Sequence, residues 1–420
     1  MNPSKPGKPA KAPGTRRPRD RKATIVDAAA QLFAERGYHA AGVSLIASRV
    51  QITGGGIYRH FRSKEEILEV ILRQVVDRAT AMATAAGSTE GSPQERLRKL
   101  VGQTVQHAVD RPAHVATHFR ERQVPSVPRH EHDLTTGEDA LAEQWRSLVL
   151  QATPRLGAEQ ADLRYHAVEG VVGTLAALGH RNPRPVSDVL AQSLMALLTA
   201  PPAPRPPRGN AAAARVRTWQ PPTSRENDIL AVALGLFRQR GFSGVLMEEI
   251  AGGLGMGTSS LYQYYTGKSD ILADAYDRVI SRLMVGVETQ LDAAESAEDA
   301  LDRLVRSYVR LTAENIDLVV VTTHEFQAMP ELERPRVTRR RRYLRESWAA
   351  VLRELRPELT AEEAKLLATC ALPLISHVLL QADDPRGAID ELTYCTLTFL
   401  LDNTPRQRGA AWSAEAESGT

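Results

Sequence analysis

The sequence predicts an all-α protein that contains two copies of one helical unit. The first observation is internal repetition: shifting the chain by 204 residues places residues 21–68 on residues 225–272 without a gap, and 13 of the 48 positions are identical. Chance pairing at average composition gives roughly three identities. The second observation is apolar residues at helical spacing over long stretches, in particular residues 65–86, 95–110, 268–293 and 338–355. The third is that no two alternating β-branched runs are joined by a hairpin turn.

Composition indicates a soluble globular protein. Hydrophobic residues make up 42% and charged residues 25% of the 420 residues, and the formal net charge is only +3. Two cysteines, Cys370 and Cys395, form no disulfide framework. The longest apolar run, residues 366–380, is too short to span a bilayer, and the basic, proline-rich N-terminus carries no apolar secretory segment. We therefore expect a cytoplasmic protein that does not enter the membrane.

Each copy begins with three predicted helices in the order of a helix-turn-helix domain. In the first copy, apolar residues share one face of the first helix, Gly37 ends that helix, and Thr53 caps the third helix. In the second copy Gly241 takes the place of Gly37. The residues expected to be buried in the first copy are Ile25, Ala29, Leu32, Phe33, Val43, Ile46, Ala47, Val50, Ile57 and Phe61, and in the second copy Ile229, Ala233, Leu236, Phe237, Met247, Ile250, Ala251 and Leu254.

These two segments resemble the TetR family of bacterial repressors. The resemblance is carried by AAAQLFAERGYHAAGVSLIA…GGGIYRHFRSKEEIL in the first copy and by ALGLFRQRGFSGVLMEEIA…TSSLYQYYTGKSDIL in the second. It implies, for each copy, an N-terminal helix-turn-helix DNA-binding domain, a larger helical ligand-sensing domain, and pairing through the last two helices. A chain with both copies is similar to the tandem two-unit regulators of actinobacteria, some of which control lipid or cell-entry operons.

The repeat and the composition divide the chain into seven segments. A proline-rich stretch separates the two copies, and proline at this density stops both helix and strand. The predicted segments are a disordered basic arm at residues 1–19, DNA-binding domain 1 at 20–68, regulatory domain 1 at 69–200, the linker at 201–222, DNA-binding domain 2 at 223–272, regulatory domain 2 at 273–404, and a disordered tail at 405–420.

The predicted DNA-contacting residues follow from residue type and place. Hydroxyl groups at the end of each third helix, and the amino groups that begin the fourth, suit phosphate, whereas polar side chains on the third helix suit base edges. The phosphate set is Tyr58, His60, Lys64, Tyr262, Tyr264 and Lys268, and the base-reading set is Thr53, Arg59, Thr258, Ser259, Ser260 and Gln263. The alternative for Tyr58 and Tyr262 is that they are core aromatics.

Two departures from the family pattern predict unlike half-sites. Gln51 stands where the family usually has a turn glycine, and residues 54–56 are all glycine where side chains normally touch bases. Three glycines cost roughly 2–3 kcal/mol of helix propensity against alanine and remove direct reading groups. The first copy is therefore expected to contribute mostly phosphate and shape contacts.

Basic residues before each DNA-binding domain offer a second mode of contact. Between Met1 and Lys22 lie eight basic residues and one acid. This arm could enter a minor groove, or it could be a solvated tail with no fixed role. The residues concerned are Arg16, Arg17, Arg19, Arg21 and Lys22 before the first domain, and Arg215, Arg217 and Arg225 before the second.

Candidate effector contacts lie in the regulatory domains. Arg341 shares a helical stripe with apolar residues, so it points inward or to a cavity edge and needs a partner, either an acid such as Glu325 or an anionic effector such as an acyl thioester or fatty acid. His118 and Trp145 in the first copy, and His324 and Trp348 in the second, complete the candidate set; both tryptophans are alternatively core residues. His114 and His118 have metal-ligand spacing, but no cysteine and few acids lie near, so we expect no metal site.

The predicted function is therefore a sequence-specific DNA-binding regulator, a repressor relieved by a small-molecule ligand. Its partners would be a double-stranded operator and an effector. If the two copies pair internally, one chain presents two DNA-binding domains; if they do not, a homodimer presents four. The alternative is a tandem scaffold that has lost DNA binding and acts through protein contacts. An enzyme is a third and weaker reading, because no nucleophile–base pair or cofactor loop is visible, and we expect no cofactor.

Overall fold

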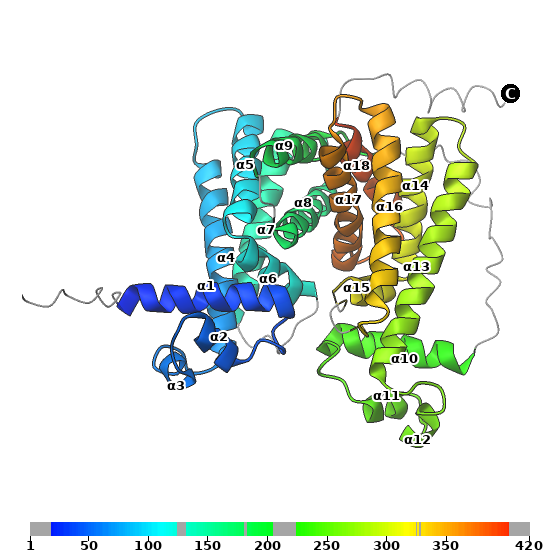
Figure 1. Ribbon diagram of the computed structural model, residues 1–420. Helices are drawn as coiled ribbons and strands as arrows, with labels where there is room; N and C mark the ends of the chain where they lie inside the picture. The colour runs from blue at the N-terminus through cyan, green and yellow to red at the C-terminus, as the bar shows by residue number, and fades with distance from the viewer. Residues whose placement is uncertain are drawn as a thin grey trace, which may run out of the picture. The chain divides into compact units, whose positions relative to one another are not determined.

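The computed structural model describes residues 18–123, 132–179, 183–204, 224–324, 326 and 329–402. Within these ranges the chain is helical with connecting turns and contains no strand (Figure 1), which confirms the predicted all-α class. The chain divides into two compact units, Met1–Ile71 and Leu72–Thr420. Residues 1–17, most of the linker (205–223) and the tail from 403 lie outside the described residues, so the predicted arm and tail stay predictions, as do the other segment boundaries.

The first unit is the predicted three-helix domain. It contains α1 (Pro18–Arg36), α2 (Val43–Arg49), α3 (Gly54–Ile57) and the start of α4 (Lys64–Gly87). Gly37 follows α1 with φ of 80°, a left-handed conformation that glycine adopts without steric cost. Nine of the ten residues expected to be buried in the first copy are buried, including Phe33, Ile46 and Phe61, and Val43 is half-buried.

The second unit contains the remaining helices. These are α5 (Pro93–Asp110), α6 (Pro112–Gln123), α7 (His132–Ala152), α8 (Ala158–Leu178), α9 (Pro183–Thr199), α10 (Arg225–Arg240), α11 (Met247–Gly253), α12 (Thr258–Leu261), α13 (Lys268–Asp292), α14 (Ala297–Glu314), α15 (Ile316–His324), α16 (Arg334–Leu355), α17 (Ala361–Gln381) and α18 (Ile389–Leu401). The helices α11, α12 and α14 begin and end 204 residues after α2, α3 and α5. The repeat therefore extends through the regulatory helices, where sequence identity is weak.

Polar caps explain where several of these helices start. The Ser92 hydroxyl accepts the Glu95 N–H at the start of α5, and the Glu95 carboxylate accepts the Ser92 N–H in return. Thr360 and Glu363 form the same reciprocal cap on α17. Each cap satisfies N–H groups that have no partner inside the helix.

The last two helices of the first copy pack against the last two helices of the second copy, and all four lie within the second unit. Helix α8 lies against α17, and α9 against α18 (Figure 1). Gly170 allows this close approach: a Cβ there would lie 2.8 Å from the Leu374 Cα and 3.0 Å from the Pro373 carbonyl oxygen. A side chain at this position would therefore force α8 and α17 apart.

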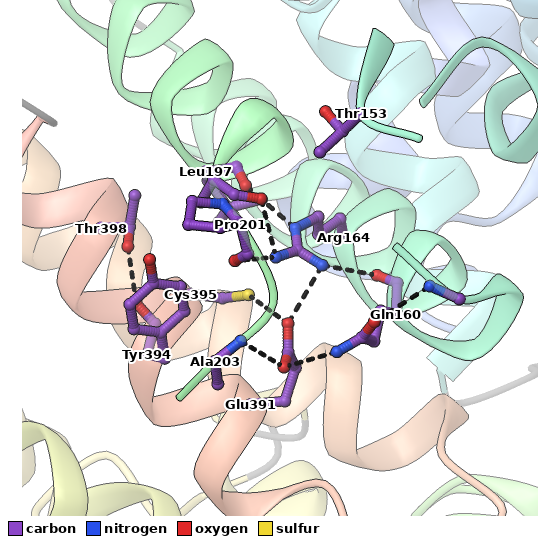
Figure 2. A network of polar contacts seen from close by, with 12 residues as sticks. Thr153, Gln160, Arg164, Leu197, Pro201, Ala203, Glu391, Tyr394, Cys395 and Thr398 are labelled. Carbon is purple, nitrogen blue, oxygen red and sulfur yellow. Dashed lines mark hydrogen bonds and ion pairs between the residues drawn. The ribbon is translucent and has the colours of Figure 1, made fainter. Parts of the chain in front are cut away.

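A buried polar network also joins the two copies (Figure 2). Arg164 on α8 is fully buried, and its Nη1 lies 3.0 Å from Oε1 of Glu391 on α18. The same guanidinium donates to the carbonyls of Leu197 and Pro201, both at 3.1 Å. A buried charge is tolerable only with a partner and satisfied hydrogen bonds, and this one has both.

Helix α17 is longer than the apolar run within it. The sequence predicted a segment too short to span a bilayer, but the helix Ala361–Gln381 is long and apolar enough by length and composition. Of its apolar window, 72% is buried inside the protein. This burial is what a core helix requires.

Candidate nucleic-acid interface

Both turns between the second and third helices have the same backbone geometry. Gln51 has φ of 56° and Gly255, its equivalent in the second copy, has φ of 62°. In the first turn the Ile52 N–H donates to the Ala47 carbonyl at 3.0 Å, and the equivalent bond in the second copy, from Met256 to Ala251, is also 3.0 Å. The first copy therefore keeps the turn although it has lost the glycine, and it carries backbone strain at Gln51.

The third helices differ in how they begin. The Thr53 hydroxyl accepts the Gly56 N–H at 3.2 Å, so Thr53 caps α3 as predicted. Gly257 takes this place in α12 and provides no side-chain cap. The side chains are thus distributed in opposite ways: the first copy has a capping hydroxyl followed by three glycines, and the second has a glycine followed by Thr258, Ser259 and Ser260.

The tyrosines that follow these helices are exposed. Tyr58 is 57% exposed, Tyr262 is 50% exposed and Tyr264 is 42% exposed. The alternative that Tyr58 and Tyr262 are core aromatics is therefore wrong. The residues one position earlier, Ile57 and Leu261, are fully buried and fix each tyrosine on the outward side.

The other predicted contact residues divide by exposure. Arg59 in the first copy and Ser259, Ser260 and Gln263 in the second are exposed, whereas His60 and Thr258 are half-buried. In the first copy, the exposed Arg59 directly follows Tyr58. In the second copy, the exposed serines and Gln263 lie within residues 259–264, together with the two exposed tyrosines. Each domain thus presents exposed polar side chains at its third helix, and the first copy presents fewer of them because residues 54–56 have no side chains.

The two lysines hold a loop inside their own domains. The Lys64 ammonium donates to the Tyr38 carbonyl at 3.0 Å and lies 4.0 Å from the centre of the Tyr38 ring. Lys268 donates to the carbonyls of Phe242 at 2.7 Å and Val245 at 2.8 Å. Burial lowers the pKa of Lys64, with Glu65 opposing that shift. Both lysines thus position the loop between the first two helices, and their contact with phosphate stays a prediction.

Some of the basic residues predicted to contact DNA before each domain lie on helices. Helix α1 begins at Pro18, so Arg21 and Lys22 lie on a helix, and the Lys22 ammonium lies 5.4 Å from the Phe61 ring centre. Arg225 likewise lies in the first turn of α10. Arg16, Arg17, Arg215 and Arg217 lie outside the described residues, as does the side chain of Arg19.

A pocket lies in the regulatory helices of the first copy. His118 and Trp145 both line it, and both are buried. The lining is mainly apolar but also contains Thr104, His107 and His118 and a charged cluster. In this cluster Arg122 forms ion pairs with Glu169 and, at 3.8 Å, with Glu138. The carboxyl pKa of Glu169 is held well below its usual range, although burial opposes this, because Arg122, His166 and His377 stabilise its charge.

A second pocket lies mainly in the regulatory helices of the second copy, and Thr174 on α8 of the first copy also lines it. Arg341 lines it, which confirms the prediction that this side chain reaches a cavity edge. Its Nη2 donates to the Thr322 carbonyl at 3.0 Å, and its guanidinium lies 5.2 Å from the Phe326 ring centre. Glu325, the predicted acidic partner, lies outside the described residues.

Trp348 and His324 are the two other residues of the second copy that were predicted to contact an effector. Trp348 is 1% exposed, packs edge-on against Tyr308 with ring centres 5.7 Å apart, and is absent from the pocket lining, so its core alternative holds. His324 ends α15, and its side chain lies outside the described residues. Arg345 also lines this pocket and was not among the predicted residues, although its spacing of four residues from Arg341 on α16 was a usable signal.

Arg122 and Glu169 were missed for another reason. They lie 47 residues apart on α6 and α8, and neither belongs to a sequence pattern that singles it out. Only the packing of the two helices brings them together. No signal in the sequence alone would have found this pair.

Two exposed helix-turn-helix domains, each followed by helices that enclose a pocket, define a tandem helix-turn-helix regulator. Family comparison gives the same class: the model for bacterial regulatory proteins of the tetR family matches residues 25–71 and 229–275, and that for the tetracyclin repressor-like C-terminal domain matches residues 294–378. The chain thus contains two tandem segments that match the TetR-family N-terminal domain and one segment that matches a tetracyclin repressor-like C-terminal domain.

Curated relatives match over part of the chain. The chain is 38% identical over 89 residues to the transcriptional activator FasR of Mycolicibacterium smegmatis, which covers 21% of this chain and 41% of FasR. It is 38% identical over 80 residues to the transcriptional repressor KstR2 of Mycobacterium tuberculosis, which covers 19% of this chain and 40% of KstR2. The chain thus spans about two fifths of the length of these relatives.

Solved structures of bacterial transcriptional regulators are similar over part of the chain. A TetR-family regulator from Bordetella parapertussis has 22% sequence identity and a TM-score of 0.40, covering 42% of this chain and 94% of that one. KstR2 of Mycobacterium tuberculosis has 19% identity and a TM-score of 0.39, covering 43% of this chain and 94% of that one.

Proposed function

We propose that this protein is a sequence-specific DNA-binding transcriptional regulator, a repressor that a small-molecule ligand releases from its operator. The carrying observation is the pair of exposed tyrosines, Tyr58 and Tyr262, at equivalent ends of two third helices. A large exposed aromatic with a hydroxyl group suits contact with a DNA backbone. The curated relatives are named as helix-turn-helix transcriptional activators and repressors, which supports this class of function.

The two domains would read two unlike half-sites. In the second copy, Ser259, Ser260 and Gln263 are exposed and carry donors and acceptors for base edges. In the first copy, Arg59 is the exposed polar group beside Tyr58, since the preceding residues are glycines. The first domain would therefore depend on phosphate contacts and DNA shape.

An internal pseudo-dimer would carry both domains. Pairing through the last two helices needs a complementary apolar surface with satisfied polar groups, and the packing of α8 on α17 and the Arg164–Glu391 pair meet that need. One chain would then present two DNA-binding domains to a double-stranded operator. A homodimer with four domains is the alternative, and sedimentation of the protein with and without operator separates the two. The site of action would be the cytoplasm, where the operator is.

The second pocket suits an anionic amphipathic effector. Arg341 and Arg345 both line it, and no acidic side chain does so among the described residues. Burial and the neighbouring Arg341 lower the pKa of Arg345, so an anion between them would relieve an unfavourable pairing of charges. The rest of the lining is mainly apolar, including Val279, Ile280 and Leu283 from α13. An acyl thioester or a fatty acid combines these two properties.

A helix connects this pocket with the second DNA-binding domain. Helix α13 begins at Lys268, which holds the loop of that domain, and continues to Tyr276 and Leu283 at the pocket. An ion pair between Arg238 on α10 and Asp317 on α15 provides a second link. An effector that binds better when these helices are displaced would shift the protein from the DNA-bound form. The domains would then miss successive major grooves, about 34–36 Å apart.

DNA binding is tested by fluorescence anisotropy with the promoter fragment upstream of the protein's own gene. Replacing Tyr58 and Tyr262 together by phenylalanine removes two hydroxyls from exposed side chains and should weaken binding about 10-fold or more, at roughly 1 kcal/mol for each lost hydrogen bond. The matched control is Tyr343→Phe, because Tyr343 is 44% exposed on α16 and lies in a regulatory domain. Unchanged affinity in the double variant would contradict the proposal.

The rival function is the scaffold that has lost DNA binding. It predicts no salt-dependent retention of any promoter fragment by the wild-type protein. The shortened reading surface of the first copy favours this rival, and the exposed tyrosines in both copies oppose it. The wild-type measurement at several salt concentrations therefore decides between the two functions before any variant is made.

The effector class is tested by calorimetric titration with palmitoyl-coenzyme A and with palmitate. Arg341→Ala should lower affinity about 10-fold or more, since it removes a charged hydrogen-bond donor from the pocket. Arg339→Ala on the same helix is the matched control, because Arg339 is exposed. Equal affinity of Arg341→Ala and wild type would remove Arg341 from the effector site.

A further inference from the structure

His166, Glu169 and His377 meet where α8 of the first copy crosses α17 of the second. The Nδ1 of His166 lies 2.8 Å from the Oε2 of Glu169, and the Nε2 of His377 lies 3.3 Å from the same oxygen. The three ligand atoms lie within 4.8 Å of one another. One helix of each copy, α8 and α17, thus contributes to a single cluster of nitrogen and oxygen atoms that could ligate a metal.

We propose that these three side chains bind one divalent transition metal ion, of which Zn²⁺ fits the donor set best. Two imidazoles and one carboxylate are a common protein contribution to Zn²⁺ with a further position open for water. With metal–ligand bonds of about 2.0–2.2 Å, neighbouring ligand atoms of a tetrahedral site lie about 3.3–3.5 Å apart. The 3.3 Å between Oε2 of Glu169 and Nε2 of His377 already agrees with this tetrahedral spacing. The 2.8 Å between the same oxygen and Nδ1 of His166 has to widen by about 0.5 Å.

Of the two carboxylate oxygens of Glu169, one is held by neighbouring side chains and the other faces the two histidines. Its other oxygen, Oε1, accepts the Tyr165 hydroxyl at 3.0 Å and a bond from Arg122. Such bonds orient a ligating carboxylate. Oε2 faces the two histidines.

Charge and protonation favour a cation here. The acidic side chains Glu138 and Glu169 outnumber the single cation, Arg122, so the cluster carries a formal charge of −1 when the histidines are neutral. Metal ligands must be an ionised carboxylate and neutral imidazoles. The ion pair with Arg122 favours the ionised form of Glu169, as a metal ligand requires.

The site has a route from solvent and a mechanical consequence. The His166 side chain is 21% exposed, whereas those of Glu169 and His377 are 6% and 0% exposed. An ion could therefore enter past His166. Once bound, it would tie α8 to α17 and so join the two copies. This inference departs from the expectation of no metal site, and it does not depend on DNA binding.

The experiment uses the full chain after treatment with a chelator and dialysis. Co²⁺ serves as a spectroscopic probe, because its visible absorption is strong in tetrahedral nitrogen and oxygen coordination. We expect one Co²⁺ per chain, displaced by Zn²⁺, and a higher Tm when Zn²⁺ is added, since a ligand that binds only the folded state stabilises it. His166→Gln and His377→Gln should each lower Co²⁺ affinity at least 10-fold.

His39→Gln is the matched control, because His39 is an exposed histidine in the first unit. Circular dichroism establishes that each variant is folded; if His377→Gln is not, His166→Gln decides, since its side chain is partly exposed. Absence of Co²⁺ absorption at equimolar metal overturns the proposal. Binding that both variants retain at wild-type affinity also overturns it, because the ion would then lie elsewhere.

Discussion

The Arg164 guanidinium and the Glu391 carboxylate form a 3.0 Å ion pair that joins α8 of the first copy to α18 of the second. The arginine is fully buried and the glutamate side chain is 15% exposed. Glu391 also accepts hydrogen bonds from Gln160 and from the Ala203 N–H, both at 3.0 Å. One carboxylate therefore holds together a helix of each copy and the start of the linker.

Replacing Glu391 by alanine should leave a buried charge without its partner. We expect the free energy of unfolding to fall by about 3 kcal/mol, because the desolvated guanidinium keeps its backbone carbonyls but loses its counter-charge. Glu143→Ala, which breaks an ion pair of a 65% exposed carboxylate, is the control and should cost no more than about 0.5 kcal/mol. Urea unfolding measures both, and equal effects would show that the Arg164 pair is not important for pairing the copies.

Gly170 should be intolerant of alanine. The added Cβ would meet the Leu374 Cα at 2.8 Å, and a backbone atom cannot move aside without the helix, so we expect a loss of about 1–3 kcal/mol in unfolding free energy. Gly102→Ala is the matched control, since it lies within α5 with nothing within 4 Å of its Cβ. That variant should gain about 0.5–1 kcal/mol from helix propensity. Thermal unfolding that moves in the same direction for both variants would contradict the expected contact.

Both cysteine thiols should be unreactive in the folded protein. Burial raises the pKa of Cys370 to about 12, and burial, opposed by Arg164, raises that of Cys395 to about 12. Only the thiolate reacts, so we expect no reaction with Ellman's reagent at pH 8 until denaturant is added, and two thiols afterwards. Ser147→Cys adds an exposed thiol as a control and should react at once. Rapid modification of the native wild type would show that α17 or α18 opens readily.

The strained turn at Gln51 and the equivalent turn at Gly255 allow two opposite substitutions, one that should relieve strain and one that should introduce it. Gln51→Gly relieves a left-handed conformation at φ of 56°, and Gly255→Gln introduces the same strain at φ of 62°. We expect the first to stabilise its own domain by about 1 kcal/mol and the second to destabilise its domain by a similar amount. Hydrogen exchange of the backbone amides in α1–α3 and in α10–α12 reports each domain separately. Changes of the same sign in both would contradict the strain argument.

The sequence predicted the features that depend on residues close to one another along the chain. Helix spacing, turn glycines and the internal repeat were enough for the three-helix domains and for the outward placement of Tyr58 and Tyr262. The contacts between the copies were not predictable, because Glu169 and His377 lie 208 residues apart and meet only through the crossing of α8 and α17. Arg341 was found because a charged residue on an apolar stripe is unusual, whereas Arg122 lies on a helix with no such contrast.

The glycines of the first third helix should be replaceable by the side chains of the second. A Cβ on Gly54 has nothing within 4 Å, and one on Gly55 has only the Thr53 hydroxyl oxygen at 4.0 Å, so Gly54→Thr with Gly55→Ser fits without moving the backbone. We expect the variant to acquire discrimination at its half-site of about 5-fold or more, at roughly 1 kcal/mol for a new contact to a base edge. Anisotropy competition with half-site mutants measures this.

Gly54→Ala with Gly55→Ala is the matched control for that variant, because it restores helix propensity without hydroxyl groups. It should tighten binding to all sequences alike and leave discrimination unchanged. If the alanine variant instead abolishes discrimination that the wild type already shows at this half-site, the glycines themselves are the reading elements. The first domain would then recognise its site by close approach of the α3 backbone to the DNA, rather than by phosphate and shape contacts alone.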